Sequence, residues 1–242
     1  MANLGFKTNA GLKRPKNEDA LFVMPRENIY IIADGVGGSN SGEVASSVAV
    51  TYLADRFKKE NIDLIEDERN TILKIFDCIE GANKNIAQMA ETAPHLQGMA
   101  TTLVVLFFKD GKGYVFNVGD SRAYIYRNSI LEQITEDHSY VNSLLKMGAI
   151  TEEEAIGHEG GHMITKALGA DKKVEPDLFT IDICKDDIIL LCTDGLYDEI
   201  SDDGITKLIA GNEGMPALAQ ELVEEANRAG GNDNITVVCV KI

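Results

Sequence analysis

The sequence predicts an α+β fold in which mainly antiparallel sheets are flanked by helices. Short runs of β-branched and aliphatic residues have the length and composition of strands. Several of these runs follow one another across short loops, and such loops join strands in antiparallel pairs. The helical patterns fall into two separate blocks along the chain. This segregation indicates helical layers on the outer faces of a β-sandwich.

The expected elements can be placed along the chain from their periodicity. Strands are expected at residues 20–24, 29–33, 101–108, 113–118, 123–127, 130–134, 178–183, 188–193 and 235–240. Helices are expected at residues 42–59, 66–91, 151–155 and 216–228. A Gly-rich turn follows the second strand, and Asp110-Gly111 and Asn128-Ser129 predict hairpin turns. Neither a linker nor a repeat divides the chain, so residues 1–242 are expected to form one domain.

Composition and charge narrow the classes of partner. With 39 acidic and 23 basic residues, the chain carries a formal charge of −16, which argues against nucleic acid or an anionic membrane as a partner. The N-terminus has no apolar signal stretch, and no apolar run reaches transmembrane length. The four cysteines show no CxxC pair and no zinc-ligand spacing. Reduced thiols and a cytoplasmic location are therefore expected. A monomer is the default expectation, because the sequence indicates no oligomer interface.

Three aspartates stand at the ends of apolar runs. Asp34 and Asp194 each follow such a run, and Asp233 precedes the last one. Carboxylates at strand ends can converge on the rim of a sheet, where they repel one another unless a cation neutralises them. Oxygen ligands favour a hard ion such as Mg²⁺ or Mn²⁺. The pattern favours a carboxylate-held metal centre, although Asp-Gly is also the commonest short turn signal.

Other motifs suggest different functions. His158-Glu159-Gly160-Gly161-His162 matches the zinc-protease pattern, which needs both histidines on one face of a helix. Its two central glycines each disfavour a helix by about 1 kcal/mol, so a loop is favoured. The glycines after Asp34 lack the spacing of a dinucleotide-binding loop. Asp137-His138-Ser139 contains the residue types of a catalytic triad, but consecutive residues cannot converge, so Ser139 or Asp137 is expected to cap a turn or helix.

One set of motifs runs through nearly the whole chain in order. Its members are Arg14-Pro15-Lys16-Asn17-Glu18-Asp19, Asp34-Gly35-Val36-Gly37-Gly38, Gly42-Glu43-Val44-Ala45-Ser46, Gly98-Met99-Ala100-Thr101-Thr102-Leu103, Val118-Gly119-Asp120-Ser121-Arg122-Ala123-Tyr124, Thr135-Glu136-Asp137-His138-Ser139, Thr165-Lys166-Ala167-Leu168-Gly169, Thr193-Asp194-Gly195-Leu196 and Gly231-Asn232-Asp233-Asn234-Ile235-Thr236. The ordered set resembles the PPM-type metal-dependent protein serine/threonine phosphatases, and the compact length resembles their bacterial branch. The resemblance implies a four-layer α-β-β-α sandwich, which agrees with the expected order of elements.

The resemblance also implies roles for the matching residues. Asp34 matches the carboxylate that bridges two metal ions, and the carbonyl of Gly35 matches a ligand of one of them. Asp194 and Asp233 match the other ligands of this pair. The ions would be Mn²⁺ or Mg²⁺, two or three in number.

Further residues match positions around that pair of ions. Glu18 and Asp19 match positions that hold metal-bound waters, and Arg14 matches the phosphate-binding arginine. Asp120, together with Asp194, matches the ligands of a third, looser ion. Residues 139–162 match a mobile flap beside the active site.

The implied activity is hydrolysis of phosphoserine and phosphothreonine in proteins, themselves products of a serine/threonine kinase, by a hydroxide that bridges two ions. Two departures bear on this activity. Val36 stands where some members have a histidine that could protonate the leaving alkoxide, so that role is expected to fall to a metal-bound water. Gly160-Gly161-His162 stands where many relatives have a basic or amide residue. Two alternatives are a catalytically weak phosphoprotein-binding module of the same fold and a zinc protease.

Overall fold

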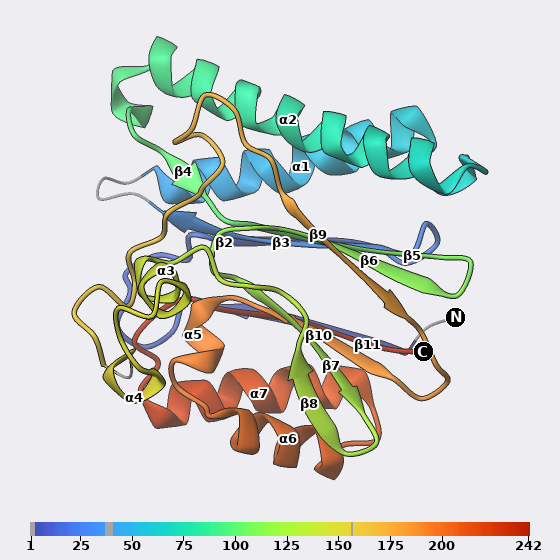
Figure 1. The fold of residues 1–242 in the computed structure, drawn as a ribbon, viewed down its shortest axis with the longest axis vertical. Helices are drawn as coiled ribbons and strands as arrows, with labels where there is room; N and C mark the ends of the chain where they lie inside the picture. Colours follow the sequence, from blue (N-terminus) through green and yellow to red (C-terminus); the bar gives the residue numbers. More distant parts are fainter. Residues whose placement is uncertain (1–2, 37–40, 156) are drawn as a thin grey trace.

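Two sheets packed face to face form the centre of the structure, and helices cover the outer face of each sheet. Figure 1 shows these layers from top to bottom in a computed structural model, which describes residues 3–36, 41–155 and 157–242. The expected four-layer α-β-β-α sandwich is confirmed. The Gly-rich turn expected at Gly37 and Gly38 lies outside the described residues.

The first sheet is antiparallel throughout. Its strands lie in the order β2 (Asp19–Met24), β3 (Ile29–Val36), β5 (Leu103–Lys109), β6 (Lys112–Val118) and β9 (Asp177–Asp182), and β4 (Ala100–Thr101) pairs with β3. The helices α1 (Gly42–Glu60) and α2 (Glu68–Thr92) cover its outer face. Within the described ranges, no helix is both long enough and apolar enough to cross a membrane.

The second sheet is also antiparallel. Its strands lie in the order β1 (Asn3–Asn9), β11 (Ile235–Lys241), β10 (Ile188–Cys192), β7 (Arg122–Arg127) and β8 (Ile130–Gln133). The helices α6 (Asp202–Gly211) and α7 (Met215–Ala229) cover its outer face. Asn3 pairs with Lys241, so the start of β1 and the end of β11 lie together at one end of the sandwich.

The central strands are buried on both faces, which explains why their sequences are unbroken apolar runs. In β3, Ile29 and Ile31 belong to the core beneath α1 and α2, whereas Tyr30 and Ile32 belong to the core between the sheets. The same alternation divides β10 and β11 between the inter-sheet core and the core beneath α7. One apolar run therefore serves two cores, because successive side chains of a strand point to opposite faces.

Both predicted hairpin turns are confirmed. Asp110 and Gly111 join β5 to β6, and their φ angles are +50° and +76°. Asn128 and Ser129 join β7 to β8, and their φ angles are +52° and +65°. Positive φ at both central residues gives the two-residue turn whose twist matches that of antiparallel strands.

The sequence did not predict several short elements. They include β1, α3 (Tyr140–Lys146), α5 (Asp194–Tyr197) and α6. The strand β1 lies at the edge of its sheet and depends on its pairing with β11, which no local pattern reveals. Both α3 and α6 begin at a serine cap, Ser139 and Ser201, whose hydroxyl accepts a hydrogen bond from a backbone N–H of the first turn. The expected capping role of Ser139 is thus confirmed.

Gly5 marks a close approach between a helix and the second sheet. A Cβ atom at Gly5 would overlap the backbone carbonyl of Met215 at the start of α7. We predict that Gly5→Ala lowers the free energy of unfolding by about 1–3 kcal/mol, the usual range for overpacking, as measured by denaturant unfolding. Gly211→Ala is the matched control, because the space around a Cβ there is open. Unchanged stability of Gly5→Ala would mean that α7 can move away from β1 without loss.

Candidate metal centre and active site

Acidic residues at the ends of strands from both sheets line one cavity. Their strands reach the end of the sandwich opposite the paired ends of β1 and β11, where β3 ends and β11 begins (Figure 1). Asp34 lies near the end of β3, directly opposite Asp19 on β2. Asp194 follows β10 as the first residue of α5, and Asp233 precedes β11. The structure therefore brings together four aspartates that lie far apart in the sequence.

A cavity of about 670 Å³ opens at this end of the sandwich. Seven of the eight residues expected in the site line it, namely Arg14, Glu18, Asp34, Gly35, Asp120, Asp194 and Asp233. The eighth, Asp19, is buried, and its Oδ2 accepts a hydrogen bond from Thr193 Oγ1 at 2.9 Å. Most of the expected carboxylates therefore line the cavity, whereas that of Asp19 is buried beside it.

Hydrogen bonds to the main chain fix the part of β3 that carries Asp34. The backbone N–H of Asp34 donates to Thr102 Oγ1 at 2.9 Å, and Thr101 Oγ1 donates to the Asp34 carbonyl at 2.7 Å. The Thr102 hydroxyl also lies 2.7 Å from that of Ser121, the neighbour of Asp120. Two adjacent threonines therefore position Asp34 through its backbone, and its carboxylate is left to line the cavity.

Gly35 allows β3 to pass close to the start of α1. A Cβ atom at Gly35 would overlap the carbonyl of Gly42 and would lie 2.6 Å from the carbonyl oxygen of Glu18. The Gly35 N–H donates to that same Glu18 oxygen at 3.1 Å. Because Asp34-Gly35 lies inside a strand and Asp194-Gly195 begins a helix, the alternative that these pairs are simple turns is wrong.

Asn234 links the loop of Glu18 to the strand of Asp233. Its Oδ1 accepts a hydrogen bond from the Glu18 N–H at 2.7 Å, and its Nδ2 donates to the Lys16 carbonyl at 2.8 Å. Its own N–H donates to Asp233 Oδ1 at 2.8 Å. The other oxygen of Asp233 accepts from Arg14 Nη2 at 2.5 Å. One buried amide thus holds Glu18 and Asp233 at the same cavity.

Burial and mutual repulsion raise the pKa values of the carboxyl groups in the site. Burial is the largest cause for each, and a neighbouring carboxylate adds to it. The pKa of Asp19 and that of Asp120 are raised to about 7, and the pKa of Asp194 is raised to about 6. The pKa of Asp34 lies well above its ordinary value. Of these groups and Asp233, only Asp233 forms an ion pair with a basic side chain of the described residues.

The donor set fits divalent cations. Asp19 Oδ1 and Asp194 Oδ1 are buried and have no hydrogen-bond partner among the described residues. A buried carboxylate oxygen without a partner is strongly unfavourable, and Arg14 supplies only one positive charge to the group. Closely spaced carboxylate oxygens are the ligands that Mg²⁺ and Mn²⁺ prefer.

Asp120 lies on a loop that an aromatic and ionic cluster holds in place. The Tyr197 hydroxyl donates to the Asp120 carbonyl at 3.0 Å. The guanidinium carbon of Arg122 lies 3.6 Å from the centre of the Tyr197 ring, and Arg122 Nη2 donates to Asp137 Oδ2 at 2.6 Å. These contacts set the position of Asp120 from outside the cavity.

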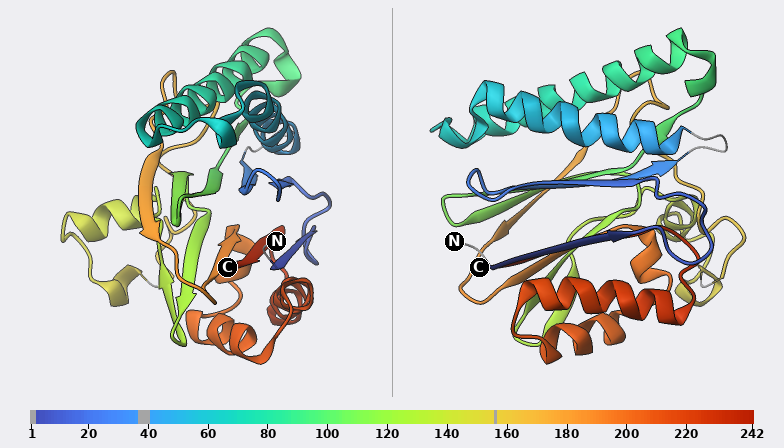
Figure 2. Two further views of the ribbon diagram at one scale, coloured as in Figure 1. Left: turned by 90° about the vertical axis from the view of Figure 1, so that its right-hand side faces the viewer. Right: turned by 180° about the vertical axis from the view of Figure 1, so that it is seen from behind.

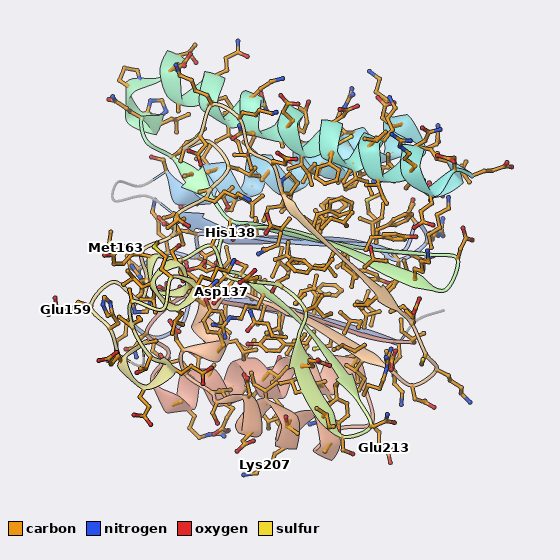
Figure 3. All side chains as sticks on the ribbon, viewed as in Figure 1. Asp137, His138, Glu159, Met163, Lys207 and Glu213 are labelled. Atoms are coloured by element: carbon orange, nitrogen blue, oxygen red, sulfur yellow. The ribbon has the colours of Figure 1, made fainter. Side chains whose placement is uncertain are left out.

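The described part of the segment 139–162 stands out from the side of the sandwich (Figure 2), and its His162 lines the cavity. This segment contains α3 and α4 (Glu152–Ala155), and α4 matches the helix expected there. The Tyr140 N–H donates to the Met163 carbonyl at 2.7 Å, and the Thr165 N–H donates to the His138 carbonyl at 2.7 Å. Figure 3 shows His138 close to the sheets and Met163 near the outer edge. Main-chain bonds therefore close the base of the segment.

The zinc-protease arrangement does not form. Residues 158–162 lie in turns rather than in a helix, so their histidines do not share a helical face. His158 Nδ1 accepts a hydrogen bond from the Gly160 N–H at 3.0 Å, whereas His162 Nδ1 lies 3.4 Å from Asp198 Oδ2. The expectation of a loop is confirmed, and the zinc-protease alternative is rejected.

Several residues of the site were not predicted from the sequence. Thr193 and Asn234 orient predicted residues, while His162 and Asp198 line the cavity. Thr193 offered a signal, because it is a polar residue at the end of the apolar run 188–193. Asp198 offered none, since its position depends on the short helix α5.

Comparisons with known proteins agree with the family that the motifs resemble. The family described as protein phosphatase 2C matches residues 13–233. The serine/threonine phosphatase stp of Listeria monocytogenes is 38% identical over 239 residues, which cover 98% of this chain and 94% of that protein. The serine/threonine protein phosphatase PstP of Mycobacterium tuberculosis is 36% identical over 236 residues, which cover 98% of this chain and 44% of that protein.

Solved structures share the whole fold. The serine/threonine phosphatase Stp1 from Staphylococcus aureus has a TM-score of 0.93 at 34% identity, covering 100% of this chain and 95% of that one. The catalytic domain of PstP in complex with two manganese ions has a TM-score of 0.86 at 34% identity, covering 99% of this chain and 97% of that one. With a matching fold, a matching family profile and a carboxylate-lined cavity, the chain belongs to the protein phosphatase 2C family, the PPM-type phosphatases that its motifs resemble.

Proposed function

We propose that this chain hydrolyses phosphoserine and phosphothreonine in proteins with two or three Mn²⁺ or Mg²⁺ ions. The observation that carries the proposal is a group of buried and half-buried carboxylates in and beside one cavity, two of which have a buried oxygen without a hydrogen-bond partner among the described residues. Family membership and the names of the bacterial relatives support the same activity.

Asp34, Asp194 and Asp233 are the proposed metal ligands, together with the carbonyl of Gly35. The bound ions would neutralise these carboxylates and activate a water molecule for attack on phosphorus. The role of the protein is to hold the ligand oxygens in place before the ions bind. The hydrogen bonds from the Asp34 N–H to Thr102 Oγ1 and from the Asn234 N–H to Asp233 Oδ1 support this role.

Three more acidic residues have proposed supporting roles. Glu18 and Asp19 accept hydrogen bonds from waters at the ions, and the partnerless Oδ1 of Asp19 supports this role. Asp120, with Asp194, holds a third ion, and its place on the cavity wall supports this role.

Arg14 is the proposed phosphate-binding residue. Its side chain is 55% exposed at the cavity, and only its Nη2 donates to a described residue, Asp233. The other N–H groups of the guanidinium can therefore hold phosphoryl oxygens in two places. Val36 has no proton to give, so water is the proposed proton donor for the leaving alkoxide.

Residues 1–242 are proposed to act as one catalytic domain with a flap at residues 139–162. The segment stands out from the side of the sandwich (Figure 2), and its His162 lines the cavity, which supports the flap. The proposed substrates are proteins phosphorylated by a serine/threonine kinase, and the proposed state is a cytoplasmic monomer. Four cysteines without disulfides, three of them buried, support a reducing location.

A catalytically weak phosphoprotein-binding module of the same fold is not favoured. Such a module has no need of a metal centre, whereas every acidic position of the proposed centre is present here and lies in or beside one cavity. The two functions differ in turnover, which a hydrolysis assay measures.

Phosphate release from a phosphothreonine peptide is expected to require Mn²⁺ or Mg²⁺ and to stop with a chelator. Asp194→Asn, which removes one ligand charge, is expected to lower kcat/KM at least about a hundredfold, the scale of losing one preorganised electrostatic group. Asp203→Asn on the exposed side of α6 is the control, and circular dichroism checks the fold of both variants. Metal-dependent activity of Asp194→Asn near that of the parent would contradict the site, and no turnover by the metal-loaded parent would favour the binding module.

Arg14→Ala is expected to lower kcat/KM for a phosphopeptide by about 10–100-fold, the equivalent of losing charge-assisted hydrogen bonds. Arg14→Lys is expected to recover part of the loss, because an ammonium is a point charge and not a fork. Steady-state kinetics separate the two variants, and thermal unfolding shows whether either changes the fold. Equal activity of both variants and the parent would remove Arg14 from the site.

The thermal stabilisation by Mn²⁺ is expected to be larger at pH 7.5 than at pH 5. In the folded protein the pKa values of Asp19 and Asp194 are about 7 and about 6, against an ordinary value of 3.8. Between the ordinary and raised values the folded state binds more protons than the unfolded state, so ionisation destabilises the metal-free fold as pH rises through the raised values. Mn²⁺ must displace these protons at pH 5 but not at pH 7.5.

The measurement for this pH dependence is the rise in Tm on adding Mn²⁺ at each pH. Asp203→Asn should keep the full pH dependence, whereas Asp19→Asn should weaken it. The same rise in Tm at both pH values would contradict a centre built from carboxylates of raised pKa.

A further inference from the structure

The consecutive residues Asp137, His138 and Ser139 lie where the chain enters the flap, and the proposed function gives them no role. Asp137 accepts a hydrogen bond from Arg122 Nη2 at 2.6 Å, and the Ser139 hydroxyl caps α3. His138 lies close to the sheets (Figure 3) and contacts the loop that carries Asp120. The contacts of this histidine therefore connect the flap to the proposed centre.

His138 and Gly119 form two hydrogen bonds with each other. The His138 N–H donates to the Gly119 carbonyl at 3.0 Å, and the Gly119 N–H donates to His138 Nδ1 at 3.0 Å. Gly119, which directly precedes Asp120, has a φ angle of +100°, and a Cβ atom there would lie 2.6 Å from Thr102 Cγ2. Thr102 is the residue whose hydroxyl accepts from the Asp34 N–H. The two bonds thus hold one end of the Asp120 loop against a residue that positions Asp34.

The second ring nitrogen of His138 fixes the orientation of the ring. His138 Nε2 lies 3.2 Å from Asp177 Oδ2, and Lys166 Nζ donates to Asp177 Oδ1 at 2.8 Å. Because Nδ1 accepts a hydrogen bond, the single proton of the neutral imidazole lies on Nε2, which donates it to Asp177. Burial lowers the pKa of His138, and the Lys166 ammonium lowers it further, so the neutral form is favoured. Asp177 begins β9, so the first sheet anchors the ring.

The main chain of His138 belongs to the base of the flap. Its carbonyl accepts a hydrogen bond from the Thr165 N–H at 2.7 Å, and the next residue, Ser139, pairs with Ile164 in a β-bridge. The His138 side chain is only 13% exposed, so little space is open for the ring to turn. A movement of the flap base would therefore displace the atom that accepts from the Gly119 N–H.

We propose that His138 is a positioning residue that sets the place of Asp120 in the cavity and links it to the base of the flap. The inference rests on the proposed function, because that function gives Asp120 its role at the centre. Among the described residues, those that line the cavity do not include His138. His138 therefore acts through Gly119 and not through contact with the substrate. A shift of the flap base would loosen the Asp120 loop, and the affinity of the centre for its ions would follow.

The position of the imidazole proton can be measured in the parent protein without any substitution. Nuclear magnetic resonance spectra that correlate the ring nitrogens with the ring carbon-bound protons distinguish the two neutral tautomers and the charged form. Near neutral pH, His138 is expected to be neutral with its proton on Nε2. A proton on Nδ1 is incompatible with the hydrogen bond from the Gly119 N–H and would overturn the proposal.

Two substitutions separate the roles of the ring nitrogens. In His138→Asn the side-chain oxygen takes the place of Nδ1 and can still accept from the Gly119 N–H. In His138→Gln the amide instead takes the place of Nε2 and leaves that N–H without its acceptor. Both variants lose the ring and therefore similar packing, which thermal unfolding checks.

Amide hydrogen exchange in the metal-free protein tests the link between His138 and Gly119. Exchange of the Gly119 N–H is expected to be at least about tenfold faster in His138→Gln than in the parent, the scale of losing one hydrogen bond, and near the parent rate in His138→Asn. His158→Gln is the matched control, because His158 Nδ1 accepts from the Gly160 N–H at 3.0 Å within the flap. Exchange of Gly119 that is unchanged in His138→Gln, or equally fast in both His138 variants, would overturn the proposal.

Calorimetric titration with Mn²⁺ tests the effect on Asp120. Asp120→Asn identifies the Mn²⁺ site to which Asp120 contributes, and His138→Gln is expected to weaken that same site at least about tenfold and leave the others unchanged. His138→Asn and His158→Gln are expected to keep the parent affinity. Equal weakening of every site, or of none, in His138→Gln would overturn the proposal. Neither measurement needs turnover, so an inactive parent that binds Mn²⁺ would contradict the proposed function while these results still decide the role of His138.

Discussion

The cost of placing several buried and half-buried carboxylates close together is the constraint on which the rest of the site depends. Asp19 lies opposite Asp34 across two paired strands, and Asp194 approaches them from the other sheet. Burial is the largest cause of their raised pKa values, and the neighbouring carboxylates raise these values further. The uncompensated negative charge attracts a divalent ion. The same charge destabilises the metal-free protein, so features that favour metal binding lower the stability of the metal-free fold.

The fold positions these charges with small and neutral residues. Thr101 and Thr102 hold the backbone of Asp34, Asn234 ties the Glu18 loop to the last strand, and Gly35 lets β3 approach α1. Thr101 and Thr102 bond to the main chain of Asp34 and not to its carboxylate, whereas the Asn234 backbone N–H donates to Asp233 Oδ1. The carboxylates of the site are therefore held by the two sheets and the loops that join them, whereas the segment with α3 and α4 stands out beside them and contributes His162 to the cavity lining (Figure 2).

Much of this arrangement was predictable from the sequence, and the remainder depends on tertiary contacts. The apolar runs before Asp34 and Asp194 predicted β3 and β10, because strands buried on both faces need such runs. The edge strand β1 was missed because its sequence is weakly patterned and its order comes from β11.

In the candidate site, too, the sequence predicted some features, and others depend on tertiary contacts. The ordered motifs gave the residues that line the cavity. They could not show that Asp19 is buried beside it, or that His162 reaches Asp198, since both facts depend on how distant segments pack. The HExxH pattern was correctly expected to be a loop, because adjacent glycines disfavour a helix.

Location of the ions tests the central claim most directly. Crystals grown with Mn²⁺ and measured at the manganese absorption edge would give anomalous peaks at the bound ions. Two strong peaks in contact with Asp34, Asp194 and Asp233 are the predicted result. Manganese bound elsewhere, with no peak in contact with Asp34, would contradict a carboxylate-held metal centre at the end of this sandwich.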